Sequence, residues 1–213
     1  MKSKLLKSYA KINLSLDILG RNKNNLHNIQ SIISFINLHD RIFIKNIKNK
    51  KNIIKFNGPF SKNLKNNTIL QLIRILEKKK LLKNKYKIQV TKNIPQKSGL
   101  GGGSMNAATI LVYLLRREQI YLQENEILSI CNQIGSDVML GLDPKNLILK
   151  NNNIKKFNNK LGFHTVLIKP KIGCSTKKIY RNFKIFSKNR IKLSKGAFKI
   201  QSLQNAQNNL EKP

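Results

Sequence analysis

The stretch that decides the fold is Ile94-Pro95-Gln96-Lys97-Ser98-Gly99-Leu100-Gly101-Gly102-Gly103-Ser104-Met105-Asn106-Ala107-Ala108. An alternating apolar run, Tyr86, Ile88 and Val90, precedes it and predicts a strand. Apolar residues at helical spacing follow it from 107 to 115 and predict a helix with one buried face. A glycine-rich loop therefore joins the end of a strand to the N-terminus of a helix.

This loop has the chemistry of a phosphate cradle. Glycines let backbone N–H groups approach an anion with no Cβ in the way. A helix N-terminus adds unpaired N–H donors and the positive end of the helix dipole. The loop is not a Walker A motif, because no lysine separates Gly103 from Ser104, and it lacks the third glycine of the dinucleotide fingerprint. The alternative is a tight turn that only packs a helix on a sheet, and the loop alone leaves both interpretations open.

Length and composition predict a globular chain of one large or two small domains. Hydrophobic residues make up 40% of the 213 residues, and no apolar stretch approaches membrane-spanning length. Lys11 and Asp17 interrupt any signal-peptide core near the N-terminus. Cys131 and Cys174 are isolated, which disfavours zinc and disulfide frameworks. We therefore expect a cytoplasmic protein with no membrane partner, while its oligomeric state stays open.

The charge of the chain is strongly positive, with 42 Lys and Arg against 9 Asp and Glu, a net charge of +33. One interpretation is a nucleic-acid partner. The other is drift in composition, because Lys, Asn and Ile are frequent along the whole chain and no single arm or helix collects the basic residues. We favour drift and expect nonspecific attraction of polyanions, without a specific nucleic-acid partner.

Residues 7–19 alternate between apolar and polar and predict a half-buried strand. One face carries Ala10, Ile12, Leu14, Leu16 and Ile18, and the other carries Lys11, Asn13, Ser15 and Asp17. A lysine on the polar face of a strand is most simply a solvated guard of the sheet edge. Two further strands are predicted at 29–38 and 40–44.

Two more helices are predicted around the central one. Asn67 and Thr68 can cap a helix whose apolar positions recur from 69 to 76. Residues 124–134 have the same kind of pattern, with acids in the first turn and Gly135 as a stop. The pattern is weaker afterwards and gives a loop or hairpin at 150–160, a strand at 163–168 and a helix at 175–186.

The chain offers few candidates for a general base. The glutamates mostly lie on predicted helix surfaces, and Asp40 and Asp143 lie in turn contexts. Asp137 differs, because it follows a predicted helix end and precedes the apolar run 138–140. An aspartate in a loop usually bonds its own backbone, so its position alone does not decide between a structural and a catalytic role.

Three ordered motifs resemble the GHMP kinase superfamily. They are Ala10-Lys11-Ile12-Asn13-Leu14, the loop from Pro95 to Ala108, and Gly135-Ser136-Asp137-Val138. Further matches at His27, Gln30, Asp40 and Ser175-Thr176…Ile179-Tyr180 are similar to the branch that acts on a cytidine diphosphate-linked methylerythritol in isoprenoid biosynthesis. The resemblance implies an α+β fold of two domains, a ribosomal-protein-like α/β ATP-binding domain at 1–155 and an incomplete ferredoxin-like domain at 156–213.

The same resemblance implies ATP-dependent phosphorylation of an alcohol on that cytidine-linked substrate, with Mg²⁺. Asp137 would take the proton of the attacking hydroxyl, and Lys11 beside it would stabilise the alkoxide. Asn67 and Thr68 would lie near the nucleotide base, and Ser104 would hold the metal. The ATP phosphates would be wrapped by Pro95, Gln96, Lys97, Ser98, Gly99, Leu100, Gly101, Gly102, Gly103, Ser104 and Met105.

The implied substrate residues are Asn13, Leu26, His27 and Tyr180, with His27 and Tyr180 holding the cytosine. The chain departs from the family pattern at three places in these motifs. Lys97 and Ser98 stand where the family has glycines, Met105 replaces a serine, and Leu26 replaces an aromatic residue. The family's third glycine motif is also missing, so we expect an incomplete second domain and weak or absent kinase activity.

Two alternatives remain beside this branch. One is another small-molecule GHMP kinase, acting for instance on homoserine or mevalonate, against which His27 and Tyr180 count. The other is a basic nucleic-acid-binding protein on a related α/β fold, which the net charge of +33 favours. That last class needs neither Lys11 nor Asp137, so their joint presence favours a kinase.

Overall fold

A computed structural model describes residues 3–21, 27–62, 64, 67–151, 153–157, 164–168, 186–187 and 208–209. Its elements are, in chain order, β1 (Lys4–Arg21), β2 (His27–Ile47), β3 (Ile53–Asn57), α1 (Thr68–Lys78), β4 (Lys85–Thr91), α2 (Gly102–Arg117), α3 (Glu124–Ile134), the 3₁₀ helix η1 (Val138–Leu142), β5 (Leu147–Lys150) and β6 (Asn153–Lys156). They fall into two compact units, and the long strands β1 and β2 contribute to both.

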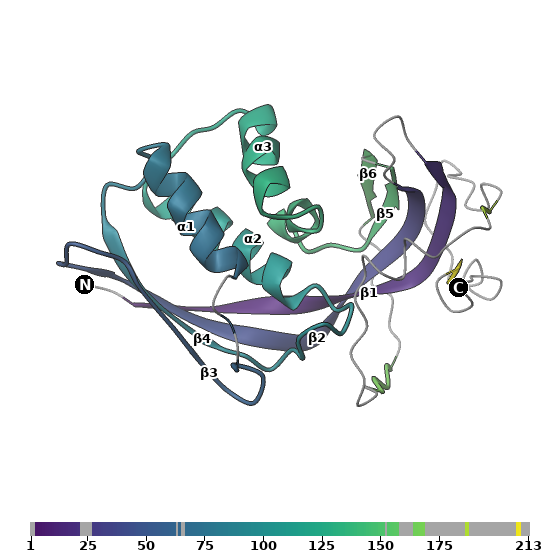
Figure 1. The fold of residues 1–213 in the computed structure, drawn as a ribbon, viewed down its shortest axis with the longest axis horizontal. Helices are drawn as coiled ribbons and strands as arrows, with labels where there is room; N and C mark the ends of the chain where they lie inside the picture. Colours follow the sequence, from purple (N-terminus) through teal and green to yellow (C-terminus); the bar gives the residue numbers. More distant parts are fainter. Residues whose placement is uncertain are drawn as a thin grey trace. The chain divides into compact units, whose positions relative to one another are not determined.

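The first unit consists of residues 1–10, 36–96 and 100–144. Its sheet places β4 between β3 and β2, parallel to β3 and antiparallel to β2. Helix α1 connects the parallel strands β3 and β4, which is the crossover that a parallel pair requires. Within this unit α1, α2 and α3 lie on one face of the sheet (Figure 1). The mixed sheet with helices confirms the predicted α+β class.

The core of the first unit lies between that sheet and its helices. Tyr86, Ile88 and Val90 of β4 are fully buried, as their alternation predicts. Asn67 caps α1 by accepting hydrogen bonds from the N–H groups of Ile69 and Leu70, also as predicted. The helix over 124–134 is confirmed at the predicted bounds, and its chain leaves the helix at Gly135. Periodicity therefore located the elements that carry the glycine loop.

The second unit consists of residues 11–35, 97–99 and 145–213, of which the structure describes only the stretches given above. Here the N-terminal part of β2 pairs antiparallel with β5, and β5 pairs antiparallel with β6. The β5–β6 hairpin confirms one of the two options predicted for 150–160. In the same unit, the N–H of Ile18 on β1 donates to Asn209 Oδ1 over 2.9 Å.

Two strand predictions are wrong in detail. The segments 29–38 and 40–44 are not separate strands but parts of the continuous β2. Polar residues did not interrupt it, because the side chain of Asp40 is fully buried and fully hydrogen-bonded inside the first unit. The polar face of β1 is not solvated either, since Lys11, Ser15 and Asp17 are all buried. Lys11 is therefore not an exposed edge guard.

The predictions for the C-terminal part can be compared with the structure only at the few residues that it describes there. Residues 164–168 have no regular secondary structure, so the described part of the predicted strand at 163–168 is not a strand. The predicted helix at 175–186 lies almost entirely outside the described residues, and the boundary at 155 stays a prediction. Within the described parts of the chain, no helix has the length and apolarity that crossing a membrane requires.

Candidate functional site

The N-terminus of α2 has no side-chain cap. Its cap residue is Gly101, which adopts a left-handed conformation with φ 69° and has no side chain to offer. In contrast, Asn67 caps α1, and Gln123 with Glu126 forms a capping box on α3. The first N–H groups of a helix have no acceptor within it. Here Met105 N already donates to Gly101 O over 2.9 Å, so the N–H groups of residues 102–104 are the ones left for an anion.

The loop before α2 turns through several left-handed residues. Gly99 and Gly101 have φ values of 73° and 69°, and Lys97 has a φ of 53°. Glycine adopts this region without steric cost, whereas lysine does so only at a cost that the surrounding structure must offset. Lys97 stands where a glycine is expected from the resemblance, and it adds a positive charge to a loop that already ends at the positive end of a helix.

The glycines at the start of α2 are in close contact with their neighbours. A Cβ at Gly102 would lie 2.9 Å from Ile94 Cγ2, closer than side-chain atoms can come. A Cβ at Gly103 would lie 3.4 Å from Thr68 Oγ1. That hydroxyl donates to Gly103 O over 2.6 Å, so the structure brings Thr68 of α1 to the first turn of α2. Asn67, beside it, uses its amide to cap α1.

Gln96 fixes the first part of the loop. Its Nε2 donates to the carbonyl oxygens of Phe60 and Lys62 over 2.9 and 2.6 Å. These bonds attach the loop to the segment that follows β3. Gln96 thereby positions the start of the loop through its side chain.

Asp137 is the N-terminal flanking residue of η1 and is partly exposed. The turn that carries it is held on α2, since a Cβ at Gly141 would lie 2.8 Å from Ala108 Cβ and 2.9 Å from Met105 Sδ. Met105 is only 2% exposed, so its side chain belongs to this packing. A Cβ at Gly135 would lie 3.9 Å from Ser104 Oγ. The structure thus brings the Gly135–Asp137 turn to the N-terminal turn of α2.

Lys11 lies in the second unit and is part of a hydrogen-bond chain. Its ammonium donates to Asn13 Oδ1 over 2.5 Å, and Asn13 Nδ2 donates to Ser31 Oγ over 2.7 Å. Ser31 Oγ donates in turn to Ser15 O over 2.6 Å. The chain fixes the orientation of the Asn13 amide, with its oxygen toward Lys11. Lys11 and Asn13, both predicted site residues, are therefore joined.

His27 begins β2 in the same unit. Partial burial and, to a lesser extent, the positive charge of Arg21 lower the pKa of His27 from its ordinary value of 6.5. The imidazole is therefore mainly neutral at pH 7 and has one donor and one acceptor nitrogen. The other predicted cytosine-side residues, Leu26 and Tyr180, lie outside the described residues.

Sequence reasoning missed Lys92 and Ser31. Lys92 follows β4 and is only 4% exposed, where it pairs with Asp40. Its signal was present, because position 92 continues the period-two row of Tyr86, Ile88 and Val90 into the buried face. Ser31 is fully buried among apolar residues of β2, and no pattern in the sequence distinguishes it from a packing residue.

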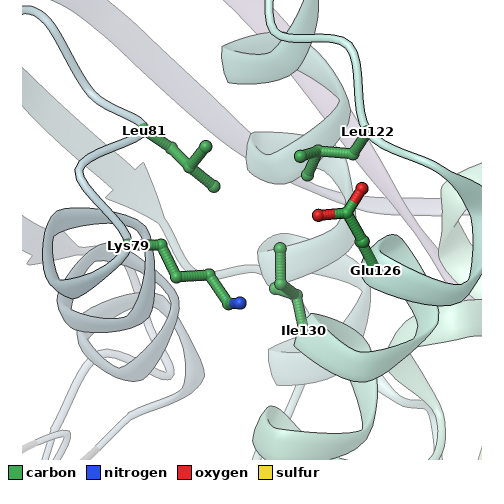
Figure 2. A pocket seen from close by; sticks show the side chains of 5 residues that line it. All are labelled: Lys79, Leu81, Leu122, Glu126 and Ile130. Atoms are coloured by element: carbon green, nitrogen blue, oxygen red, sulfur yellow. The ribbon is translucent and has the colours of Figure 1, made fainter.

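A small pocket of about 170 Å³ lies elsewhere on the first unit (Figure 2). Its lining residues are Lys79, Leu81, Leu122, Glu126 and Ile130. It lies beyond the C-terminal end of α1, with none of the predicted site residues on its wall. Ligand pockets for small molecules usually enclose at least about 300 Å³, so this one is too small to serve as the substrate site.

Metal-binding side chains are sparse in the described parts of the chain. No group of three or more His, Cys, Asp or Glu side chains gathers there. Mg²⁺ at nucleotide sites needs few protein ligands, because phosphate oxygens and waters fill most of its coordination sphere. The hydroxyl of Ser104 beside the uncapped N-terminus of α2 fits that role, whereas a metal held by the protein alone is not supported there.

Comparison with known proteins gives the family. The model of the GHMP kinases N terminal domain matches residues 67–143, which contain α1, the glycine loop, α2, α3 and Asp137. The 4-diphosphocytidyl-2-C-methyl-D-erythritol kinase of Pelagibacter ubique (strain HTCC1062) is 50% identical over 216 residues, covering 100% of this chain and 76% of that protein. The kinase of the same name from Clostridium botulinum (strain Langeland) is 33% identical over 85% of this chain.

This chain spans 65% of the length of the Clostridium kinase. Among solved structures, one of a 4-(cytidine 5'-diphospho)-2C-methyl-D-erythritol kinase resembles it with a TM-score of 0.68 and 21% identity, over 87% of this chain and 67% of that one. That likeness concerns the fold, while the 50% identity along the whole chain concerns the family. The chain therefore belongs to the GHMP kinase family, and within it to the 4-diphosphocytidyl-2-C-methyl-D-erythritol kinases.

Proposed function

We propose that this chain transfers the γ-phosphoryl group of ATP to the 2-hydroxyl of 4-diphosphocytidyl-2-C-methyl-D-erythritol. The observation that carries the proposal is the uncapped N-terminus of α2 behind a left-handed glycine loop. It occurs in a chain that is 50% identical over its whole length to a kinase named for that substrate. Among the three α-helices of the first unit, α1 has a side-chain cap and α3 has a capping box, so α2 is the one whose N-terminal donors have neither.

The nucleotide phosphates are the anion that this helix end suits. The N–H groups of residues 102–104 donate to phosphate oxygens, and the positive end of the α2 dipole adds to the attraction. The loop from Pro95 to Gly101 supplies further backbone donors and the ammonium of Lys97. Asn67 and Thr68 flank the nucleotide from α1, where Thr68 already bonds the first turn of α2.

Asp137 is the proposed general base. The oxygen of the substrate hydroxyl attacks the γ-phosphorus, the bond to the bridging oxygen of ADP breaks, and the hydroxyl proton passes to the Asp137 carboxylate. Lys11 is the proposed cation for the developing alkoxide, and Asn13 holds its ammonium through the bond described above. Phosphoryl transfer depends mostly on positioning and charge neutralisation, which these groups supply.

Mg²⁺ is proposed at Ser104, where it would neutralise charge on the β- and γ-phosphates when bound. The Ser104 hydroxyl lies in the first turn of α2, and a Cβ at Gly135 would come within 3.9 Å of it. The Ser104 hydroxyl would hold the ion beside the proposed phosphate site. No other described residue is assigned to the ion.

The cytosine side of the substrate is assigned to residues of the second unit. The neutral imidazole of His27 can donate to or accept from the edge of a pyrimidine. Leu26 and Tyr180 complete this proposal on the family pattern alone. If Leu26 lies against the cytosine, Leu26→Tyr should tighten substrate binding by about 1–3 kcal/mol, by analogy with base stacking.

Release of ADP from Mg·ATP, measured with and without the cytidine-linked alcohol, tests the proposed reaction. We expect slow ADP release that depends on this alcohol, in keeping with the weak activity expected from the sequence, and background release with mevalonate or homoserine. Substrate-dependent ADP release with one of those acceptors would move the chain to another branch of the family. Absence of release with every acceptor, in a folded protein that binds ATP, would contradict the proposal.

A further inference from the structure

A buried ionic cluster lies directly before and after the glycine loop. Its centre is Asp40 of β2, whose side chain is 0% exposed. Asp40 Oδ1 accepts hydrogen bonds from the N–H groups of Asn93 and Ile94 over 2.7 and 2.9 Å. Asp40 Oδ2 accepts from Asn106 Nδ2 over 2.9 Å and pairs with the ammonium of Lys92. One carboxylate thus receives four donors.

These donors come from both sides of the loop. Asn93 and Ile94 precede it, and Asn106 lies in α2 just after it. The Asn106 side chain is 1% exposed, and its Oδ1 has no hydrogen-bond partner among the described residues. Its amide is thus committed to Asp40 alone. The carboxylate fixes the separation between the point where the chain leaves the sheet and the point where it joins the helix.

Gly102, the first residue of α2, lies between Ile94 and Asn106, the two points that Asp40 holds. A Cβ at Gly102 would be 2.9 Å from Ile94 Cγ2 and 3.4 Å from Lys92 Nζ. The loop between the two anchors contains Lys97, a residue other than glycine at φ 53°. Such a backbone persists only where surrounding contacts hold it. A loop that is already held in its binding conformation loses less entropy when it takes up a ligand.

We propose that Asp40 is a positioning residue that holds the glycine loop ready for the phosphates of ATP. The inference rests on the proposed nucleotide site and adds a residue that touches neither nucleotide nor substrate. Loss of the Asp40 carboxylate would release both ends of the loop and weaken ATP binding. The competing explanation is that the cluster only stabilises the core.

The chain offers a matched control for that explanation. Glu118, just after α2, is also a buried carboxylate, 5% exposed. It accepts from Tyr86 Oη, from Asn84 Nδ2 over 3.1 Å and from Lys83 N over 3.3 Å. None of its donors belongs to the glycine loop. Glu118→Gln therefore makes the same chemical change as Asp40→Asn, at the other end of the helix.

The test compares the two variants in the whole 213-residue chain. Titration of Mg·ATP gives the Kd, urea unfolding without nucleotide gives the stability, and steady-state kinetics give the two KM values. For Asp40→Asn we expect the Kd and KM for ATP to rise about tenfold or more, because the loop loses its preorganisation. We expect the KM for the cytidine-linked alcohol and the kcat at saturating ATP to change much less. For Glu118→Gln we expect lower stability with an ATP Kd within about twofold of wild type.

Several results would overturn the inference. One is an unchanged ATP Kd in folded Asp40→Asn, and another is an equal rise in Kd in Glu118→Gln. If Asp40→Asn does not fold, Asn106→Ala takes its place, because it removes one donor and keeps the ion pair. A wild-type Kd in folded Asn106→Ala would count against the anchor just as directly. Failure of the wild-type protein to bind Mg·ATP would instead refute the nucleotide site itself, and the inference with it.

Discussion

Helix α2 has a buried carboxylate near each end, and the two ends differ in what surrounds it. At the N-terminal end Asp40 receives donors from the chain before the glycine loop and from Asn106. At the C-terminal end Glu118 receives donors from Tyr86 and from the connection between α1 and β4. Both carboxylates are buried and both are well satisfied by hydrogen bonds.

The difference lies in the backbone beside each carboxylate. The Asp40 end contains an uncapped helix N-terminus, left-handed residues and glycines with no room for a Cβ at Gly102. The Glu118 end is closed by the N–H of Glu118, which donates to Leu114 O over 2.9 Å. A buried charge is therefore not by itself a sign of function. Helix N–H groups without a side-chain cap next to it distinguish the end at which we propose that the ATP phosphates bind.

The largest expected effect concerns Asp137, on the turn that packs against the N-terminal part of α2. Asp137→Asn keeps the shape of the side chain and removes the proton acceptor. Loss of a general base typically lowers the rate by about 10²–10⁴, while ATP affinity should barely change. The steady-state rate of ADP release measures the loss of rate, and titration with Mg·ATP measures the affinity. Turnover at the wild-type rate would exclude Asp137 from the reaction.

The next effect concerns Gly102, where the glycine loop joins α2. Gly102→Val places a side chain 2.9 Å from Ile94 Cγ2, so either the loop or α2 must shift. Overpacking of this kind costs about 1–3 kcal/mol, which corresponds to roughly 5- to 150-fold in the ATP Kd if the strain falls on the bound loop. Gly103→Ala is the control, because its Cβ meets Thr68 at a tolerable 3.4 Å. Undiminished nucleotide affinity in Gly102→Val would refute the cradle.

At the other end of α2, Tyr86→Phe should lower stability without touching nucleotide binding. It removes the hydroxyl that donates to Glu118 and leaves a buried carboxylate with one donor fewer. We expect a loss of about 1–3 kcal/mol in the free energy of unfolding. Urea unfolding beside ATP titration measures both quantities. A clear loss of ATP affinity here would remove the distinction between the two ends.

The smallest effect is the part of the pH dependence of stability that Tyr86 contributes at the Glu118 end. Burial and, after it, the hydrogen bond to Glu118 raise the pKa of Tyr86 above its ordinary value of 10. The folded chain therefore keeps this proton above pH 10 while the unfolded chain loses it, so stability falls as pH rises through that range. Tyr86→Phe should show a shallower fall than wild type between about pH 9 and 11. If stability fell equally steeply with pH in Tyr86→Phe and in wild type, Tyr86 would not contribute to the pH dependence of stability.

Much of the fold follows from periodicity in the sequence. The buried row of β4 and the faces of α1 and α3 were predictable, because apolar spacing reports directly which side of an element is covered. The glycine loop was predictable for a related reason, since only glycine occupies left-handed positions freely. The family motifs then indicated Lys11 and Asp137.

The errors share one physical cause. Lys11 was expected in solvent and Asp40 at a strand boundary, because charged residues are rarely buried. Both are buried. Asn106, a residue distant in sequence, is one of the donors that make the burial of Asp40 tolerable, and such a partner cannot be read from local spacing. The ammonium of Lys11 bonds Asn13, only two residues away on β1. Lys92 is the exception, since the alternation from Tyr86 to Ile94 already placed it inward.

Amide hydrogen exchange with and without Mg·ATP tests most directly whether the two ends of α2 differ as described. It reports local protection along the chain in one experiment on the intact protein. We predict that ATP slows amide exchange in residues 96–105 and leaves residues 83–86 and 113–120 as they are without nucleotide. Equal protection at both ends, or protection only at 83–86 and 113–120, would contradict the assignment of the nucleotide to the N-terminal end of α2.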